Sequence, residues 1–210
     1  MNDATVNTQN KDRLFKKIFG SEDHRAWTLS LYNAVNGSNY TDPDKIEYNT
    51  IDDFLYLGYH NDVSFIIGET VNLYEHQSTY NPNLPLRFLI YVGKIYAKYV
   101  SAENNSIDIY RRKREIIPVP KFICFYNGSE KRPETEVMRF SDLLPPGSRS
   151  DIEITVNVLN INPEYNARLL EACQALKEYS LFTAAIRKNV YSKGMHDGCN
   201  IVIFLDLSAI

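Results

Sequence analysis

The acidic residues Asp62 and Glu75 and the carboxamide Gln77 are the side chains in this sequence whose types and spacing most clearly suggest chemistry. Oxygen ligands of this kind suit Mg²⁺ or Mn²⁺, with water and phosphate completing the coordination shell. A metal held there would activate a water and neutralise charge on a transferring phosphoryl group, so the three residues predict phosphodiester hydrolysis. On spacing alone, a solvated pair of acids at a sheet edge accounts for Asp62 and Glu75 equally well.

A β-hairpin is the element that must bring the two acids together. Alternating apolar residues on both sides of Gly68 favour two strands joined by a two-residue turn with glycine at its first position. That turn sets Ile67 opposite Thr70. Counting outward along both strands then sets Asp62 opposite Glu75, with Cβ atoms about 4.5–5.5 Å apart.

The alternation of side chains along the second strand determines which side chains lie on the same face as Glu75. Glu75 and Gln77 point to one face, whereas Tyr74 and His76 point to the other. Two carboxylates and a carboxamide oxygen therefore form one cluster. Facing carboxylates repel unless a cation lies between them, which is the physical argument for a metal.

A helix predicted over residues 84–101 carries a cationic face directly downstream of the hairpin. Arg87, Tyr91, Lys94 and Lys98 recur at intervals of four, three and four residues, which is the spacing of one helix face. A solvated face explains this stripe when it is taken alone. Beside a carboxylate cluster, the same side chains suit a phosphate backbone. The inward stripe consists of Phe88, Val92, Ile95 and Tyr99.

The remaining segments predict a mixed α/β domain. Helices are expected over residues 11–19, 21–35 and 162–191, and strands over 51–57, 119–126 and 152–158, with 119–126 buried on both faces. Residues 129–151 read as a long loop with at most a short element near 137–140. Residues 104–115 form a polar excursion that contains the densest basic patch, Arg111, Arg112, Lys113 and Arg114, and such a run is usually a solvated loop.

The composition limits the number of domains and the kinds of partner that the protein can have. A chain of 210 residues with 44% hydrophobic content is long enough for one domain or one domain with an appendage. A net charge of -3 gives no general attraction for nucleic acid, so a phosphate-binding surface has to be local. The odd set of well-separated cysteines fits reduced thiols, and no apolar run is long enough to span a bilayer. We therefore expect a cytoplasmic protein without membrane association.

Several other chemistries lack the residues that they require. His24, His60, His76 and His196 are scattered without the ligand spacing of a zinc hydrolase. The sequence has no glycine-rich phosphate loop, no nucleophile elbow and no dinucleotide fingerprint, so nucleoside triphosphate chemistry and serine hydrolysis are not expected.

The segments around the acids resemble a known family. The strings DVSF, LYEHQST and NPNLPLRFLIYVGKIY, with KDRLFKKIFG near the start, closely resemble the Rpn group of recombination-promoting nucleases, also described as transposases, in the PD-(D/E)XK nuclease superfamily. The likeness extends from about Lys11 to Tyr191. It implies an α-β-β-β-α-β restriction-endonuclease-like core, here with an extra strand and a long C-terminal helix.

The resemblance also implies roles for individual residues. Asp62 and Glu75 would be metal ligands in a Mg²⁺- or Mn²⁺-dependent DNA endonuclease, and Gln77 occupies the position where the superfamily usually has lysine. Gln77 cannot carry a charge, so it can only orient water or phosphate through hydrogen bonds. Asp12 would be a further acidic residue beside the metal, although locally it reads as a helix-start residue. Helical spacing, and not the resemblance, assigns Arg87, Tyr91, Lys94 and Lys98 to a contact with the DNA backbone.

The expected organisation is a disordered N-terminus over residues 1–10, a nuclease-like domain over 11–191 and an atypical tail over 192–210. That tail departs from the family, whose members usually continue into a further helical region, and a truncation or altered reading frame would explain it. Two alternatives to an endonuclease remain. One is a catalytically silent nuclease-like module that binds DNA or a partner such as a full-length relative, and the other is a self-associating structural domain.

Overall fold

The computed structural model describes residues 9–48, 62–102 and 107–193, with side chains described from residue 13 to residue 188. Its helices are α1 (Gln9–Phe19), α2 (Arg25–Asn36), α3 (Leu84–Ser101), α4 (Ala167–Ala172) and α5 (Gln174–Lys193). Its strands are β1 (Glu47–Tyr48), β2 (Val63–Ile67), β3 (Thr70–Gln77), β4 (Val119–Tyr126), β5 (Thr135–Arg139) and β6 (Thr155–Asn160). Short 3₁₀ turns lie at Glu22–His24, Pro43–Lys45 and Phe140–Leu143.

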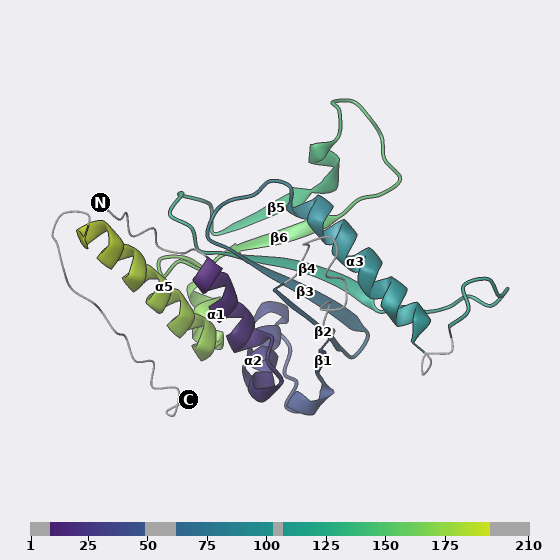
Figure 1. Cartoon of the computed structure of the whole chain (residues 1–210), viewed down its shortest axis with the longest axis horizontal. Coiled ribbons are helices and arrows are strands. Elements are labelled where there is room, and N and C mark those ends of the chain that lie inside the picture. Colours follow the sequence, from purple (N-terminus) through teal and green to yellow (C-terminus); the bar gives the residue numbers. More distant parts are fainter. Residues whose placement is uncertain (1–8, 49–61, 103–106, 194–210) are drawn as a thin grey trace.

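The strands form one mixed sheet in the order β1-β2-β3-β4-β6-β5 (Figure 1). Strands β3, β4 and β6 are parallel, whereas β1, β2 and β5 pair in antiparallel fashion with their neighbours. Strand β4 is central, as its near-continuous apolar sequence predicts, but only residues 122–126 are buried, because its first three residues lie at the exposed end of the strand. The prediction of a mixed α/β architecture is confirmed.

Helices cover both faces of the sheet. Helices α1, α2, α4 and α5 pack on one face, in a core that contains Phe15, Phe65, Tyr74 and Phe125. Helix α3 packs on the other face, in a core that contains Leu73 and side chains of β4 and β6. Because Leu73 and Tyr74 enter different cores, the side chains of β3 alternate as predicted, and Glu75 lies on the α3 face.

The β2–β3 hairpin has the predicted register. Ile67 lies opposite Thr70, and the ladder continues outward to the pair Val63 and Tyr74. Gly68 has φ 57°, a left-handed conformation that glycine adopts without a steric penalty. One step beyond this ladder, Asp62 comes opposite Glu75.

The predicted strand over 152–158 is observed as β6 (Thr155–Asn160), and the helix predicted over 21–35 begins with a 3₁₀ turn before α2. Two larger differences concern β5 and α4. The segment expected to be mostly loop contains β5, which pairs with β6 along its whole length. The helix expected from residue 162 begins only at Ala167 and is divided at Cys173. Asn162 does not cap it, because its Oδ1 accepts a hydrogen bond from Arg187 Nη2, while its side-chain nitrogen donates to the Gly128 carbonyl and to Asn160 Oδ1. Asn166 then turns the chain with φ 48° before α4 begins.

Some predictions fall on residues that the structure does not describe. These are the disordered N-terminus, of which residues 1–8 lie outside the described ranges, the strand over 51–57, and the tail after residue 193. Within the described ranges, no helix is long and apolar enough to span a membrane. Cys124 and Cys173 are fully buried free thiols, and Cys199 lies outside the described residues.

Candidate functional site

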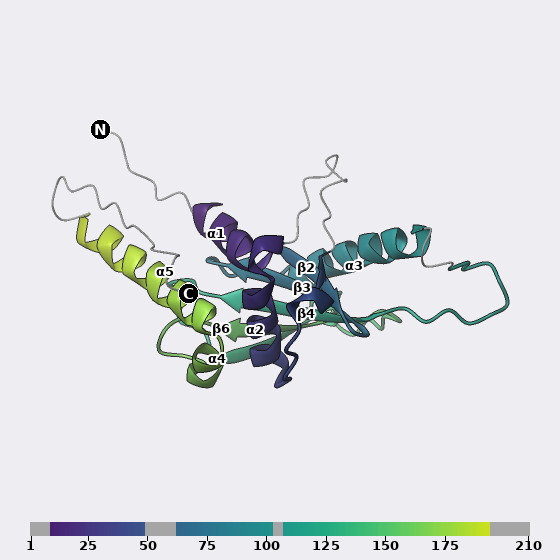
Figure 2. The same cartoon turned by 90° about the horizontal axis from the view of Figure 1, so that it is seen from below.

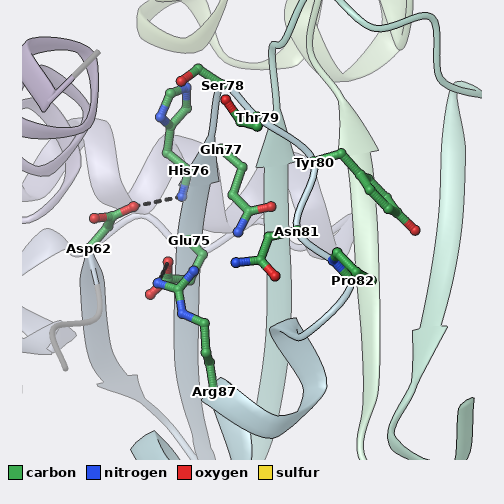
Figure 3. Close-up of a pocket in the computed structure, with 10 residues that line it drawn as sticks. All are labelled: Asp62, Glu75, His76, Gln77, Ser78, Thr79, Tyr80, Asn81, Pro82 and Arg87. Atoms are coloured by element: carbon green, nitrogen blue, oxygen red, sulfur yellow. Dashed lines mark hydrogen bonds and ion pairs between the residues drawn. The ribbon is translucent and has the colours of Figure 1, made fainter. Parts of the chain in front are cut away.

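A pocket of about 360 Å³ opens at the carboxyl end of β3, beside the first turn of α3 (Figure 3). It is lined by Asp62 from the start of β2, by β3 and the loop that follows it, and by Arg87 from α3. The full lining consists of Asp62, Glu75, His76, Gln77, Ser78, Thr79, Tyr80, Asn81, Pro82 and Arg87. The hairpin register therefore brings both predicted acids to one pocket.

Asp62 is anchored to the neighbouring strand. Its Oδ2 accepts a hydrogen bond of 2.7 Å from the backbone N–H of His76, drawn as a dashed line in Figure 3. A charged acceptor strengthens such a bond, to a contribution of about 1.5–3 kcal/mol. The bond fixes the carboxylate of Asp62 beside the Glu75 position of β3.

Glu75 forms an ion pair with Arg87. Its Oε2 lies 2.8 Å from Arg87 Nη2, and the two side chains are 2% and 29% exposed. The Arg87 guanidinium is held in turn by Tyr91, whose hydroxyl accepts bonds of 3.2 Å from Nε and 3.1 Å from Nη2. Figure 3 shows Arg87 rising from α3 to meet Glu75 on β3.

The electrostatics of the pocket follow from these contacts. Burial acts to lower the pKa of the Arg87 guanidinium, but Glu75, Tyr91 and Asp62 raise that pKa above its usual value overall. For Tyr91, burial and then the charge of Glu75 raise the pKa to about 12. Arg87 is thus a fixed cation and Tyr91 a neutral hydrogen-bond partner at physiological pH.

His76 and Gln77 leave β3 in different directions (Figure 3). The His76 ring is buried, stacks on Phe15 of α1 with centroids 5.3 Å apart, and has its Nε2 2.9 Å from the hydroxyl of Tyr179 on α5. Gln77 is on the α3 face with Glu75. His76 therefore packs the strand against two helices and contributes its backbone N–H to the site, while Gln77 contributes a side chain.

The predicted site residues divide into three groups. Asp62, Glu75, Gln77 and Arg87 line the pocket. Tyr91 is 1% exposed, is not part of the pocket lining and contacts the lining residue Arg87. The other residues are Lys94 and Lys98, which lie farther along α3, and Asp12, which lies in α1 with its side chain outside the described set.

Sequence reasoning missed two features of this pocket. The loop Ser78–Pro82 forms much of its wall, and its direct continuation from Gln77 was the available signal. The ion pair between Arg87 and Glu75 was also missed. Its two members are twelve residues apart on different elements, and only the packing of α3 on the sheet brings them together.

The chemistry of the donors fits a hard divalent cation. Asp62 and Glu75 each offer two carboxylate oxygens with about four acceptor sites in all, and Gln77 adds a neutral oxygen. The described part of the chain contains no group of three or more His, Cys, Asp or Glu side chains that could hold a metal. A cation at this pocket would have two acidic ligands and would take its remaining ligands from a carboxamide, water or phosphate.

Comparisons of the chain with protein-family models, with curated proteins and with solved structures found no match. The resemblance to recombination-promoting nucleases therefore stays a prediction.

Proposed function

We propose that the protein is a Mg²⁺- or Mn²⁺-dependent DNA endonuclease that hydrolyses phosphodiester bonds, linked to recombination or transposition-type processing of DNA. The observation that carries the proposal is the shared pocket of Asp62 and Glu75, which follows from the hairpin register. Two acidic oxygen ligands beside an arginine suit a divalent cation and a phosphate in one place.

The order of elements supports a PD-(D/E)XK-type core. Helix α2 is followed by β1, β2, β3, α3 and β4, which is the α-β-β-β-α-β order expected from the resemblance. The three strands form an antiparallel meander, and α3 connects β3 to the parallel strand β4. Strands β5 and β6 and helix α5 then extend this proposed core.

Each polar side chain has a role in the proposal. Asp62 and Glu75 hold the metal, which when bound supplies a water of lowered pKa and neutralises charge on the phosphoryl group. Gln77 orients the water or the phosphate by hydrogen bonds, since it has neither charge nor a proton to lose. Arg87 donates to the phosphate through Nη1, which neither Glu75 nor Tyr91 contacts, and Tyr91 keeps the guanidinium in position.

The ion pair between Arg87 and Glu75 favours a second candidate. Arg87 already neutralises Glu75, and Gln77 replaces a lysine, so the same geometry suits a catalytically silent module that binds DNA or a partner. Such a module would bind DNA without a metal and would cleave none.

A nicking assay on supercoiled plasmid separates the two candidates. The endonuclease proposal expects Mg²⁺- or Mn²⁺-dependent nicking that is lost on Asp62→Asn or Glu75→Gln. Glu69→Gln is the matched control, because Glu69 is an exposed acid at the tip of the same hairpin. Equal nicking by the wild type and both acid variants would indicate a contaminant and would remove the basis for the proposal.

A further inference from the structure

Residues 107–118, here called the basic arm, form an exposed connection between α3 and β4. Arg111, Arg112, Lys113 and Arg114 are consecutive and all exposed. Ten large hydrophobic side chains are exposed among the described residues, and four of them lie in the arm, with a fifth directly after it. These are Ile109, Tyr110, Ile116, Ile117 and Val119, and Tyr110 is the most exposed at 92%.

The charges of the arm are available to a partner. Arg111 pairs with Asp108 at 3.0 Å, but the two side chains are 72% and 40% exposed, so solvent screens this pair and a phosphate can replace it. Arg112, Lys113 and Arg114 make no hydrogen bond or ion pair with any residue that the structure describes. Three arginines and a lysine therefore face solvent together, although the chain as a whole is acidic.

The arm lies at the opposite end of α3 from the pocket. Figures 1 and 2 show it projecting past the C-terminal end of α3 and away from α1, α2 and α5. Arg87 stands in the first turn of α3, and the fourteen residues from Arg87 to Ser101 span about 21 Å along the helix. Lys94 and Lys98 lie between them on the predicted cationic face. The 21 Å from Arg87 to Ser101 correspond to about six base pairs of duplex at about 3.4 Å each.

We propose that the basic arm is a second DNA contact, separate from the pocket, that binds the phosphate backbone and groove edge of duplex DNA. The inference rests on the proposed function for its substrate class. Arginine and lysine neutralise phosphates, and isoleucine or tyrosine beside them packs against sugars or enters a groove, as in proteins that reach into the minor groove with short basic arms. A duplex must extend more than about six base pairs beyond the pocket to reach both contacts.

Equilibrium DNA binding in buffer with EDTA tests the arm independently of any metal. The test variant changes all four arm cations to glutamine, and the matched control removes the same charge elsewhere through Lys17→Gln, Lys45→Gln, Arg168→Gln and Lys188→Gln, all exposed. Loss of four phosphate contacts reduces the slope of log binding constant against log salt concentration by about 3.6 in magnitude. The test variant should therefore bind a duplex of about 20 base pairs about 100-fold more weakly than the wild type at low salt. A hairpin duplex of about six base pairs cannot reach the pocket and the arm together, so the wild type binds it more weakly than the long duplex, and the test variant shows a smaller difference between the two lengths.

The outcomes separate this inference from the proposed function. If the test variant binds the long duplex as tightly as the wild type, or loses no more than the control variant, the arm proposal is wrong, and the nicking assay still decides the endonuclease. If the wild type fails to nick plasmid but shows arm-dependent binding, the endonuclease is wrong and the arm proposal holds. Arm-dependent pelleting with phosphatidylserine vesicles, without arm-dependent DNA binding, would make the arm a membrane contact and overturn the inference.

Discussion

Arg87→Gln is the substitution that probes the pocket most sharply, because the guanidinium occupies the position of a competing cation. Glu75 is 2% exposed and Arg87 is 29% exposed, so the substitution leaves a buried carboxylate without its counter-ion. Breaking a fully buried pair costs about 3–5 kcal/mol, and the partial exposure of Arg87 reduces the expected loss to about 2–3 kcal/mol. The free energy of unfolding of the metal-free protein should fall by that amount.

The same substitution should strengthen metal binding. With Arg87 removed, the pocket keeps the two negative charges of Asp62 and Glu75 and loses its positive charge. The repulsion between the Arg87 guanidinium and a metal ion a few ångströms away exceeds about 1.4 kcal/mol even at an effective dielectric constant of about 20. Removing this repulsion should raise Mn²⁺ affinity at least about tenfold. Nicking should nevertheless weaken, because the phosphate contact of Arg87 is lost.

Urea unfolding and calorimetric Mn²⁺ titration measure the two effects. A double-mutant cycle with Glu75→Gln should give a coupling of about 2 kcal/mol, since the double variant leaves no buried charge unpaired. Lys98→Gln is the control on the same helix, and it should change stability by less than about 0.5 kcal/mol. Unchanged stability and unchanged Mn²⁺ affinity in Arg87→Gln would show that Arg87 is neither the counter-ion of Glu75 nor a competitor of the metal ion.

Three further predictions concern the elements that hold the pocket. Gly68→Ala should lower the free energy of unfolding by about 1–2 kcal/mol, because an alanine at φ 57° is strained, and a loss as large in Gly68→Asn would argue against this cause. Tyr179→Phe should cost about 1–3 kcal/mol in thermal unfolding by leaving His76 Nε2 without this partner, and an unchanged melting temperature would contradict the role of that bond. Burial, with the charges of Glu75 and Asp62, raises the pKa of the Cys124 thiol well above its usual value. Mass spectrometry should therefore find Cys124 unmodified by iodoacetamide at pH 8 in the native protein and modified in urea. Rapid labelling of the native protein would contradict the burial of this thiol.

The hairpin could be predicted from sequence because its determinants are local. The turn at Gly68 fixes the register, and the two-residue period of the strands fixes the faces, so the position of Asp62 opposite Glu75 follows by counting. Helix α3 was also predictable, because its apolar stripe has a clear helical period. Its observed span, Leu84–Ser101, is the predicted one.

The missed features depend on contacts between distant segments. Asn162, Pro163 and Glu164 have the residue types of a helix start, but the side-chain oxygen of Asn162 accepts from Arg187, and the helix begins later. Strand β5 is short and partly exposed, and only its pairing with β6 makes it a strand. The ion pair of Arg87 with Glu75 likewise depends on the docking of α3 on the sheet, which the spacing of residues within α3 does not reveal.

The most direct test of the central claim, that Asp62 and Glu75 together hold a divalent cation, is a calorimetric titration of Mn²⁺ into the wild type, Asp62→Asn and Glu75→Gln. Circular dichroism establishes that each variant is folded before the titration. We expect saturable binding by the wild type and loss of that binding in both variants, with Glu69→Gln binding as the wild type does. Wild-type Mn²⁺ affinity in either Asp62→Asn or Glu75→Gln would show that the two acids do not hold the cation together.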